Sequence, residues 1–215
     1  MNFTNQQQTV INLENGTHLV LAPAGTGKSE VLASRLIRGI ELGKDETKMV
    51  CLTFTNRASQ NMIQRVQQKL KSETQIFIGN IHNFSSNFLY QNGVFSETSS
   101  LINENESLAI FQNDLSHLDI FEIGKIKKLN SYLKAEKLNI PLKLLQKPES
   151  NIFQYRSVCE NYEKIKTDSN LFDFDDILLL TYKYLIDNPD KNYQFDWIQV
   201  DEVQDLNSLQ WAIIE

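Results

Sequence analysis

The chain has 215 residues, with 27 acidic and 21 basic side chains, so its net charge is −6 with the three histidines neutral. A composition of 41% hydrophobic and 22% charged residues, with 8 Gly and 4 Pro, excludes a disordered tail, a collagen-like fibre and a disulfide-rich secreted scaffold. Apolar runs are too short to cross a bilayer and no signal-peptide pattern stands at the N-terminus, so we expect a soluble cytoplasmic protein with no membrane partner. Cys51 and Cys159 are expected to be buried thiols of a reducing compartment. The acidic balance argues against a purely electrostatic grip on nucleic acid but leaves room for a local basic groove.

The first 80 residues and the last 20 contain short apolar runs that are typical of strands. These runs are residues 18–22, 49–54, 75–78 and 197–201, and each suits a strand buried on both faces of a parallel sheet. Apolar residues recur at helical spacing in 28–42 and 56–70, which predicts a helix after each of the first two runs. The alternation of strands and helices predicts an α/β domain with right-handed βαβ crossovers.

The middle of the chain has a different pattern, which is helical and lysine-rich. From about 86 to 170 strand-like runs disappear, and Pro141 and Pro148 divide the region into segments. We therefore expect a first α/β part at 1–86, an inserted helical subdomain at 87–170 and a second α/β part at 171–215. The lysines of the insertion form either a solvated helix face or a nucleic-acid contact, and they are Lys125, Lys127, Lys128, Lys134, Lys137, Lys143 and Lys147.

A glycine-rich loop lies between the first predicted strand and the first long helix. It fits G-x-x-x-x-G-K-[ST] except that alanine replaces the first glycine. Glycines let the backbone turn and aim N–H groups at phosphate oxygens, and the start of the helix adds a positive dipole. Lys28 would reach the β- and γ-phosphates and Ser29 would ligate Mg²⁺. The alternative is a glycine-rich turn with a chance lysine. The loop reads Ala22, Pro23, Ala24, Gly25, Thr26, Gly27, Lys28 and Ser29.

Two carboxylates follow the last predicted strand. Asp201 would hold Mg²⁺ and Glu202 would polarise the attacking water. An acidic pair alone is commonly a strand end that meets solvent. Because it occurs together with the phosphate loop, the two motifs predict an ATPase-type site that uses ATP and Mg²⁺.

These motifs, in this order, resemble the superfamily 1 DNA helicases of the UvrD/Rep/PcrA type through nearly the whole α/β part. The resemblance implies a RecA-like P-loop NTPase fold, with a parallel sheet flanked by helices and an inserted all-helical subdomain. Residues 3–8 (FTNQQQ) resemble the Q motif and place Gln7 at the glutamine that reads the adenine edge. Residues 201–205 (DEVQD) resemble motif II, in which Gln204 corresponds to the residue that couples the γ-phosphate to the DNA path and Asp205 to the one that braces the loop. Alanine at position 22 is common in these helicases.

Two further segments resemble motifs that contact single-stranded DNA in this family. Residues 53–58 (TFTNRA) match motif Ia, so Phe54 would stack on a base while Thr55 and Asn56 contact the DNA backbone. Alternatively, Phe54 is a core residue and Thr55 or Asn56 caps the next helix. Residues 79–82 (GNIH) are a variant of motif Ib, in which His82 either touches a phosphate or lies in a turn.

One position of the phosphate-loop helix departs from the family pattern. Members usually carry an arginine, which stacks on adenine, at the position of Glu30, so phosphate binding is expected more firmly than adenine selectivity.

Residues 172–178 (FDFDDIL) are similar to the DFDDLL segment that follows the insertion in the family, and their acids cap a helix or pair with basic neighbours.

The resemblance implies the N-terminal ATP-binding portion of an ATP-dependent helicase or translocase that acts on single-stranded DNA, or at a junction of single- and double-stranded DNA, in the 3′-to-5′ direction. Its partner would be a second RecA-like domain of the same protein, which these 215 residues do not contain, so the piece alone is expected neither to hydrolyse ATP efficiently nor to unwind DNA. Two alternatives stay open. One is the motor part of a RecB- or AddA-like helicase–nuclease or of a defence system. The other is a degenerate module that only senses nucleotide.

Overall fold

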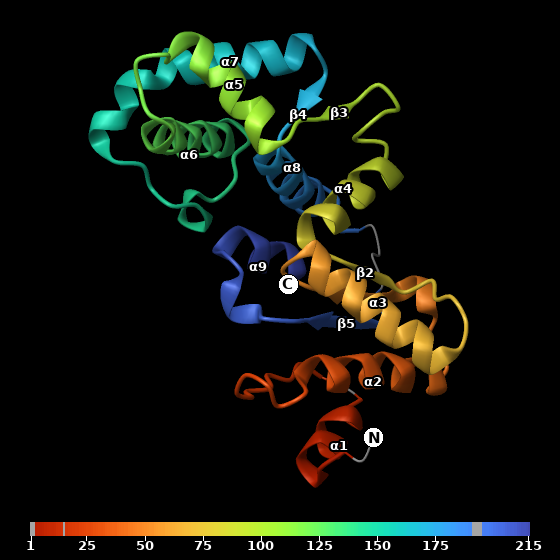
Figure 1. The fold of residues 1–215 in the computed structure, drawn as a ribbon. Coiled ribbons are helices and arrows are strands. Elements are labelled where there is room, and N and C mark those ends of the chain that lie inside the picture. Colours follow the sequence, from red (N-terminus) through yellow and green to blue (C-terminus); the bar gives the residue numbers. More distant parts are fainter. Residues whose placement is uncertain (1–2, 15, 191–194) are drawn as a thin grey trace. The chain divides into compact units, whose positions relative to one another are not determined.

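The structure is a computed structural model that describes residues 3–14, 16–190 and 195–215 (Figure 1). The chain divides into two compact units. Unit 1 contains the described residues of 3–84 and 195–205, and unit 2 contains those of 85–190 and 206–215. Within the described ranges, no helix has both the length and the apolar character that a membrane span requires.

Unit 1 is built on a parallel sheet with the strand order β2-β1-β5. β1 (Met49–Leu52) lies in the centre and pairs with β2 (Phe77–Gly79) and with β5 (Trp197–Val200), so Cys51 faces Ile78 on one side and Gln199 on the other. All four residues of β1 are buried, as expected for a central strand with both faces covered. Since the three strands are parallel, their carboxyl ends lie at the same edge of the sheet.

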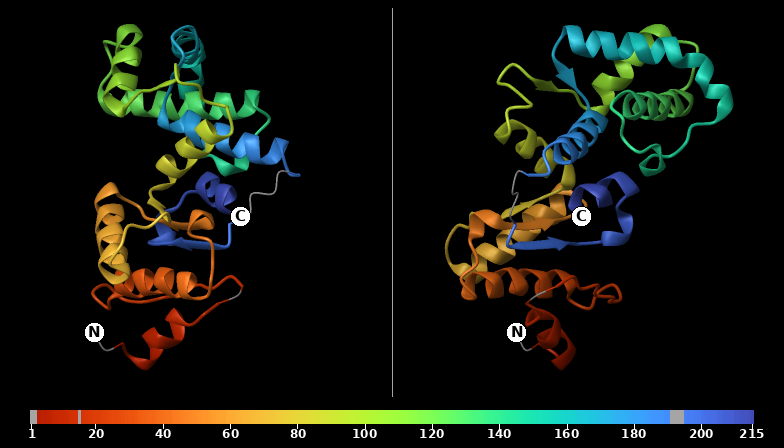
Figure 2. Two further views of the ribbon diagram at one scale, coloured as in Figure 1. Left: turned by 90° about the vertical axis from the view of Figure 1, so that its right-hand side faces the viewer. Right: turned by 180° about the vertical axis from the view of Figure 1, so that it is seen from behind.

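Two amphipathic helices cover one face of this sheet. α2 (Lys28–Glu41) and α3 (Asn56–Leu70) pack against each other and bury Leu36 and Val66 with Met49 and Cys51 of β1. α2 also lies between the sheet and α1 (Asn5–Ile11), as Figure 1 and both views of Figure 2 show. A Cβ added at Gly39 would come within 2.6 Å of the Met49 side chain, so glycine permits this close packing of α2 on β1. Short 3₁₀ turns occupy Glu46–Lys48 and Val203–Asp205.

The structure confirms the predicted α/β character and corrects one strand. The helix predicted at 56–70 is α3, and the other three predicted strands are present with shifted or shorter ends. Residues 18–22 form no strand, and the side chains of Leu19 and Leu21 are 71% and 86% exposed. Apolar composition reports that a segment could be buried, but a strand also requires a neighbour within hydrogen-bonding distance, and no described strand pairs with this segment.

Unit 2 is predominantly helical. Its core joins α5 (Glu104–Asp114), α6 (Ile120–Lys137) and α7 (Arg156–Asp168) through Phe111, Ile126 and Tyr162, and the rings of Phe111 and Tyr162 stack with centroids 4.1 Å apart. The remaining helices are α4 (Ile81–Gln91), which begins in unit 1, α8 (Phe174–Asp187) and α9 (Ser208–Ile214), with 3₁₀ turns at Leu142–Leu144 and Ser150–Tyr155.

Two features of unit 2 differ from the sequence prediction. The predicted all-helical insertion contains a short strand, β3 (Ser100–Leu101), which pairs in parallel with β4 (Leu171–Phe172). A two-residue strand is too short to produce a recognisable pattern of alternation. In addition, α8 and α9 from the predicted second α/β part belong to unit 2 by their packing. Pro141 and Pro148 do lie outside helices, as expected.

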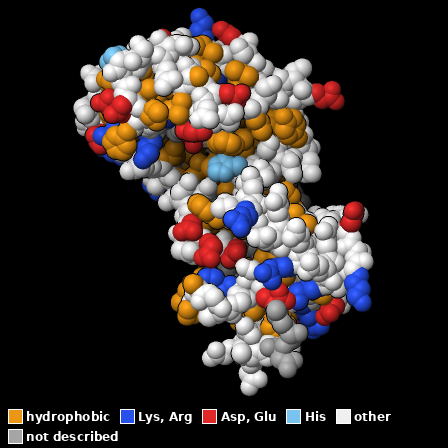
Figure 3. All heavy atoms as spheres, viewed as in Figure 1, with side chains coloured by type: hydrophobic (Ala, Val, Ile, Leu, Met, Phe, Trp, Pro, Cys, Tyr) orange, Lys and Arg blue, Asp and Glu red, His pale blue; other side chains and the backbone are white. Residues whose placement is uncertain are grey.

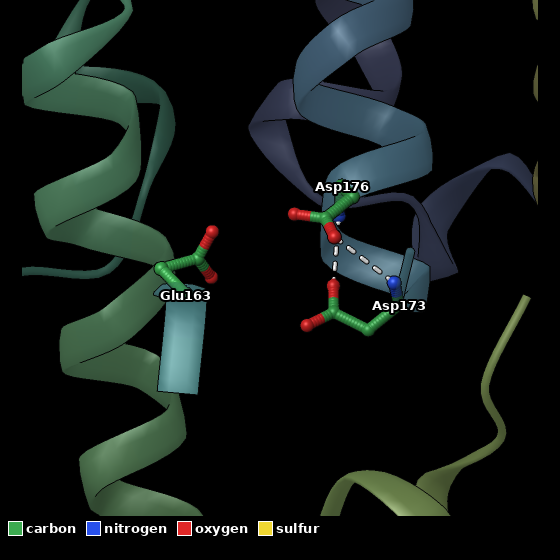
Figure 4. Close-up of side chains that lie close together, drawn as sticks. All are labelled: Glu163, Asp173 and Asp176. Carbon is green, nitrogen blue, oxygen red and sulfur yellow. Dashed lines mark hydrogen bonds between the residues drawn. The ribbon is translucent and has the colours of Figure 1, made fainter. Parts of the chain in front are cut away.

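Buried charges hold the start of α8 against α6 and α7. The carboxylates of Glu163, Asp173 and Asp176 lie close enough together to suggest a metal site (Figure 4). However, the Lys166 Nζ lies 2.8, 2.7 and 2.7 Å from Glu163, Asp173 and Asp176, and Lys134 Nζ contacts Glu163 at 2.9 Å and also pairs with Asp176. The two ammonium groups supply the positive charge that a cation would bring, so this is an ion-pair cluster rather than a metal site.

The pKa values of this cluster show that its partners depend on each other. Burial alone would lower the pKa of Lys166, but the charges of Asp176, Asp173 and Glu163 raise it above its ordinary value. Burial would likewise raise the pKa of Asp173, but Lys166 holds it below its ordinary value of 3.8. Removal of Lys166 would therefore leave buried carboxylates without their compensating charge.

Lys166→Met should lower the free energy of unfolding by about 3–5 kcal/mol at pH 7, because it leaves an uncompensated buried charge. Asp173 with a depressed pKa stabilises the native protein above pH about 3.8, and this contribution is lost as the pH falls through the folded-state pKa. Without Lys166, burial raises the pKa of the carboxylates that remain, so in the variant they take up protons as the pH is lowered towards 4, and the deficit of the variant should shrink. Urea unfolding between pH 4 and 7 measures both effects.

The matched control is Lys183→Met, which removes a partly exposed lysine paired with Asp187 at 2.8 Å on α8. An exposed pair of this kind contributes about 0–1 kcal/mol, so the control should unfold almost as the parent does. Equal losses in both variants would contradict a stabilising role of the buried cluster.

Candidate functional site

The phosphate loop has the backbone conformation that its glycines allow. Gly25 and Gly27 have φ of 77° and 80°, in the left-handed region that other residues rarely adopt. Thr26 Oγ1 donates a hydrogen bond to the Pro23 carbonyl at 2.7 Å and closes the turn. α2 begins directly afterwards at Lys28, and Pro23, Ala24, Gly25, Thr26 and Gly27 are all exposed. The sequence therefore places an open turn at the positive end of a helix of 14 residues, an arrangement that suits an anion.

Lys28 and the acids after β5 come together beside this loop. Lys28 Nζ lies 3.4 Å from Glu202 Oε1 and 3.5 Å from the Ala22 carbonyl oxygen. Gln204 Nε2 donates to the other carboxylate oxygen of Glu202 at 2.8 Å. The hydrogen bond from Gln204 and the contact with Lys28 hold the pKa of Glu202 below its ordinary value, so the carboxylate is ionised at neutral pH. Residues predicted from two motifs 174 positions apart, Lys28 and Glu202, therefore form one site.

The backbone of Glu202 is as unusual as its side-chain contacts. Its φ is 52°, and the following turn is closed by a hydrogen bond from the Asp205 N–H to the Glu202 carbonyl at 2.9 Å. A non-glycine residue in the left-handed region is uncommon and costs about 1–3 kcal/mol, and such residues cluster at functional sites.

Asp201 has the environment of a metal-binding carboxylate. Its N–H continues the sheet by donating to the Leu52 carbonyl at 2.8 Å, and its Oδ1 accepts from the Glu202 N–H at 3.1 Å. Burial and the charge of Glu202 raise the pKa of Asp201, so a nearby cation would relieve an unfavourable negative charge. Ser29 lies exposed in the first turn of α2. A hydroxyl and a carboxylate are oxygen donors of the kind that Mg²⁺ prefers, so these two residues fit that ion.

Gln7 lies against the phosphate loop. Its Nε2 donates to the Thr26 carbonyl at 3.0 Å, and its Oε1 accepts from the Thr4 N–H at 2.8 Å as part of the capping box that starts α1. The structure therefore joins the N-terminal helix to the loop that the sequence predicted for phosphates.

The two segments proposed to contact DNA also lie together, at the carboxyl ends of β1 and β2. Phe54 follows β1 with 58% of its side chain exposed, so it is not a core residue. Thr55 Oγ1 accepts from the Ala58 N–H at 3.1 Å and caps α3. Asn56 Oδ1 accepts a hydrogen bond from Asn80 Nδ2 at 2.8 Å. His82 lies partly buried near the start of α4, and burial lowers its pKa, which favours the neutral ring.

Sequence reasoning missed the role of Asn80 and the partners of Glu30. Asn80 directly follows a predicted strand, as the predicted DNA contacts at Phe54, Thr55 and Asn56 follow β1, and this shared position was the signal for its contact with Asn56. Glu30 is paired with Arg65 at 2.8 Å and with Lys69 at 2.5 Å, which lowers its pKa and links α2 to α3. The signal was the pair of basic residues one turn apart on the predicted helix at 56–70.

The lysine-rich segment is only partly available for a nucleic acid. Lys127 is paired with Glu104 at 2.6 Å, Lys125 with Glu149 at 3.5 Å, and Lys134 belongs to the buried cluster. On the face drawn in Figure 3, acidic and basic side chains of unit 1 are interleaved rather than gathered into a single basic patch. The face in view therefore presents mixed charges, and Lys125, Lys127 and Lys134 are already paired with carboxylates.

Comparison with known proteins gives consistent results over the whole chain. Residues 3–215 match the UvrD/REP helicase N-terminal domain. The putative ATP-dependent DNA helicase YjcD of Bacillus subtilis is 30% identical over 99% of this chain and 30% of its own length. The ATP-dependent DNA helicase PcrA of Leuconostoc citreum is 26% identical over 99% of this chain and 30% of its own length.

A third relative, the ATP-dependent DNA helicase Rep of Buchnera aphidicola, is 27% identical over 100% of this chain and 34% of its own length. The chain thus spans about a third of the length of the curated relatives that it matches. Since the family match extends over nearly every residue, the chain belongs to the UvrD/REP helicase N-terminal domain family.

Proposed function

We propose that this chain is the nucleotide-binding part of an ATP-dependent helicase that moves along single-stranded DNA in the cytoplasm. The observation that carries the proposal is the meeting of Lys28, Glu202 and Gln204 beside a phosphate loop with two glycines at positive φ. The names of the relatives support the ATP-dependent activity. The 3′-to-5′ direction rests on the sequence resemblance alone.

Each residue of the site has a chemical task in this proposal. Lys28 leaves Glu202 and binds the terminal phosphates, while the N–H groups of the loop bind the remaining phosphate oxygens. Glu202 then accepts a proton from the attacking water, and Gln204 keeps its carboxylate oriented. Ser29 and Asp201 are the residues that would hold Mg²⁺, which neutralises charge on the phosphates when bound. Gln7, which is hydrogen-bonded to the phosphate loop, would contact the base, as the sequence resemblance implies.

The proposed DNA contact uses the exposed ring of Phe54. An aromatic ring beside polar groups is a combination that binds single strands, because bases stack on the ring and amides contact the backbone. Asn56, held by Asn80, supplies the amide next to Phe54. This edge of the sheet also carries Asp201 and Glu202, so binding of DNA and chemistry on nucleotide would occur at the ends of adjacent strands.

Lys28→Ala and Glu202→Gln should each lower the DNA-stimulated ATPase kcat of the whole protein by about 10²–10⁴-fold, since each removes a group that acts on the reacting atoms. Steady-state ATP hydrolysis with and without single-stranded DNA measures this. Matched controls are Lys48→Ala and Glu73→Gln, both exposed and away from the site. A parent that binds ATP but never hydrolyses it would indicate a nucleotide sensor instead of a motor.

Phe54→Leu should weaken binding of a short single-stranded oligonucleotide by about 5–150-fold, because loss of one stacking contact costs about 1–3 kcal/mol. Phe54→Tyr keeps an aromatic face and should bind nearly as the parent does. Fluorescence anisotropy with a labelled oligonucleotide gives the dissociation constants. If leucine and tyrosine at this position bind equally well, Phe54 does not act by stacking.

A further inference from the structure

Arg35, in the middle of α2, connects three separate parts of unit 1. Its Nε donates to Gln199 Oε1 of β5 at 3.1 Å, and its guanidinium carbon lies 4.8 Å from the centre of the Trp197 ring. Its Nη1 donates to the Leu13 carbonyl at 2.9 Å and also to the Val10 carbonyl. A planar guanidinium with several fixed donors can make these contacts together, whereas a lysine ammonium cannot.

The contacts with Val10 and Leu13 hold the carboxyl-terminal end of α1. Carbonyl oxygens at the end of a helix lack partners within the helix, and a cation there is also favoured by the helix dipole. α1 has only seven residues, of which Ile11 alone is buried, and a helix this short is not stable by itself. Its position must therefore depend on contacts with the rest of unit 1.

The amino-terminal part of the same helix contacts the phosphate loop through Gln7, whose Nε2 donates to the Thr26 carbonyl at 3.0 Å. α1 is thus attached at one end to the loop and at the other to Arg35. Gln199 strengthens the second attachment, because its Nε2 donates to the Leu32 carbonyl at 3.1 Å while its Oε1 accepts from Arg35. Through Arg35, the helix that carries Gln7 is therefore attached to β5 of the sheet.

We propose that Arg35 is a positioning residue that acts through α1, holding Gln7 against the phosphate loop so that the base of a bound nucleotide contributes to affinity. The inference rests on the proposed function, and it assigns to Arg35 a part in recognising the base but not the phosphates. It also separates Arg35 from Lys28, whose loss affects the phosphates directly.

A merely structural role makes a different prediction. If Arg35 only stabilised the fold, a folded variant would bind a nucleotide and an inorganic triphosphate in the same ratio as the parent. If Arg35 positions Gln7, affinity for the nucleotide falls while affinity for the triphosphate is kept. The ratio of the two affinities is therefore the decisive quantity.

The test measures binding of Mg-ATP and of Mg-triphosphate to the whole protein by titration calorimetry. Arg35→Ala should weaken ATP binding by about tenfold, equivalent to about 1.4 kcal/mol, and change triphosphate binding by less than about twofold. The ATP affinity of Arg35→Lys should lie between those of the parent and of Arg35→Ala, because lysine keeps the positive charge but lacks the planar guanidinium with its several donors. The matched control is Arg38→Ala, on the same helix, where Arg38 pairs only with Glu14 and Glu41 at 3.2 and 3.5 Å among the described residues.

A double-mutant cycle with Gln7→Ala tests the route of action. Because both residues are proposed to act on one contact, the double variant should lose little more ATP affinity than either single variant does. Full additivity, or an equal loss for both ligands in a variant whose circular dichroism is native, would overturn the inference and leave the proposed function intact. If Arg35→Ala does not fold, Arg35→Lys decides by the same ratio. A parent protein that, tested whole, binds neither ligand would contradict the proposed nucleotide site itself, and with it this inference.

Discussion

β1 forms parallel hydrogen-bonded ladders with β2 on one edge and β5 on the other, and the site in unit 1 depends on this pairing. Parallel strands end at the same edge of a sheet, so segments that follow them meet there although they lie far apart in sequence. The residues after β1 supply Phe54 and Asn56, those after β2 supply Asn80, and those after β5 supply Asp201 and Glu202. The register Leu52↔Val200 continues into the hydrogen bond from the Asp201 N–H to Leu52, which fixes where the acids begin. A single buried strand therefore sets the spacing between the nucleotide chemistry and the polar edge proposed to bind DNA.

The two units use charge for different purposes. In unit 2, Lys166 is almost inaccessible and surrounded by carboxylates, so the pairs hold α8 to its neighbours and leave little charge for a ligand. At the candidate site of unit 1, the side chains of Lys28 and Glu202 are more exposed, and they lie 3.4 Å apart. Exposed groups can exchange one partner for another at small cost, whereas buried pairs cannot. This difference explains why the strongest clusters of opposite charge are not the place where chemistry is proposed.

Sequence patterns predicted the elements that depend on the local spacing of residues. They failed for features that depend on contacts with residues far away in the sequence. The phosphate loop and α3 were predictable because glycine, lysine and the apolar positions of a helix have local physical consequences. Residues 18–22 were wrongly predicted as a strand because apolar composition cannot show whether a neighbouring strand is present. Glu30 looked like a defect in a nucleotide site, and only the structure shows that Arg65 and Lys69 of α3 neutralise it. Arg35 carried no motif signal, since its significance lies in carbonyl groups of a helix more than twenty residues earlier.

The ion pair between Lys28 and Glu202 has a consequence for how the site meets an anion. The chain provides its own counter-ion for the lysine, so the local electric potential near Lys28 is much weaker than a lone ammonium would give. In the proposed function, an approaching triphosphate would first be attracted by the oriented backbone dipoles of the loop and of α2. In the proposed mechanism, exchange of the carboxylate for phosphate on Lys28 would leave Glu202 held by Gln204 alone and free to act as a base when the triphosphate has arrived. Under this proposal, binding of the anion and release of the base would result from the same exchange of partners at Lys28.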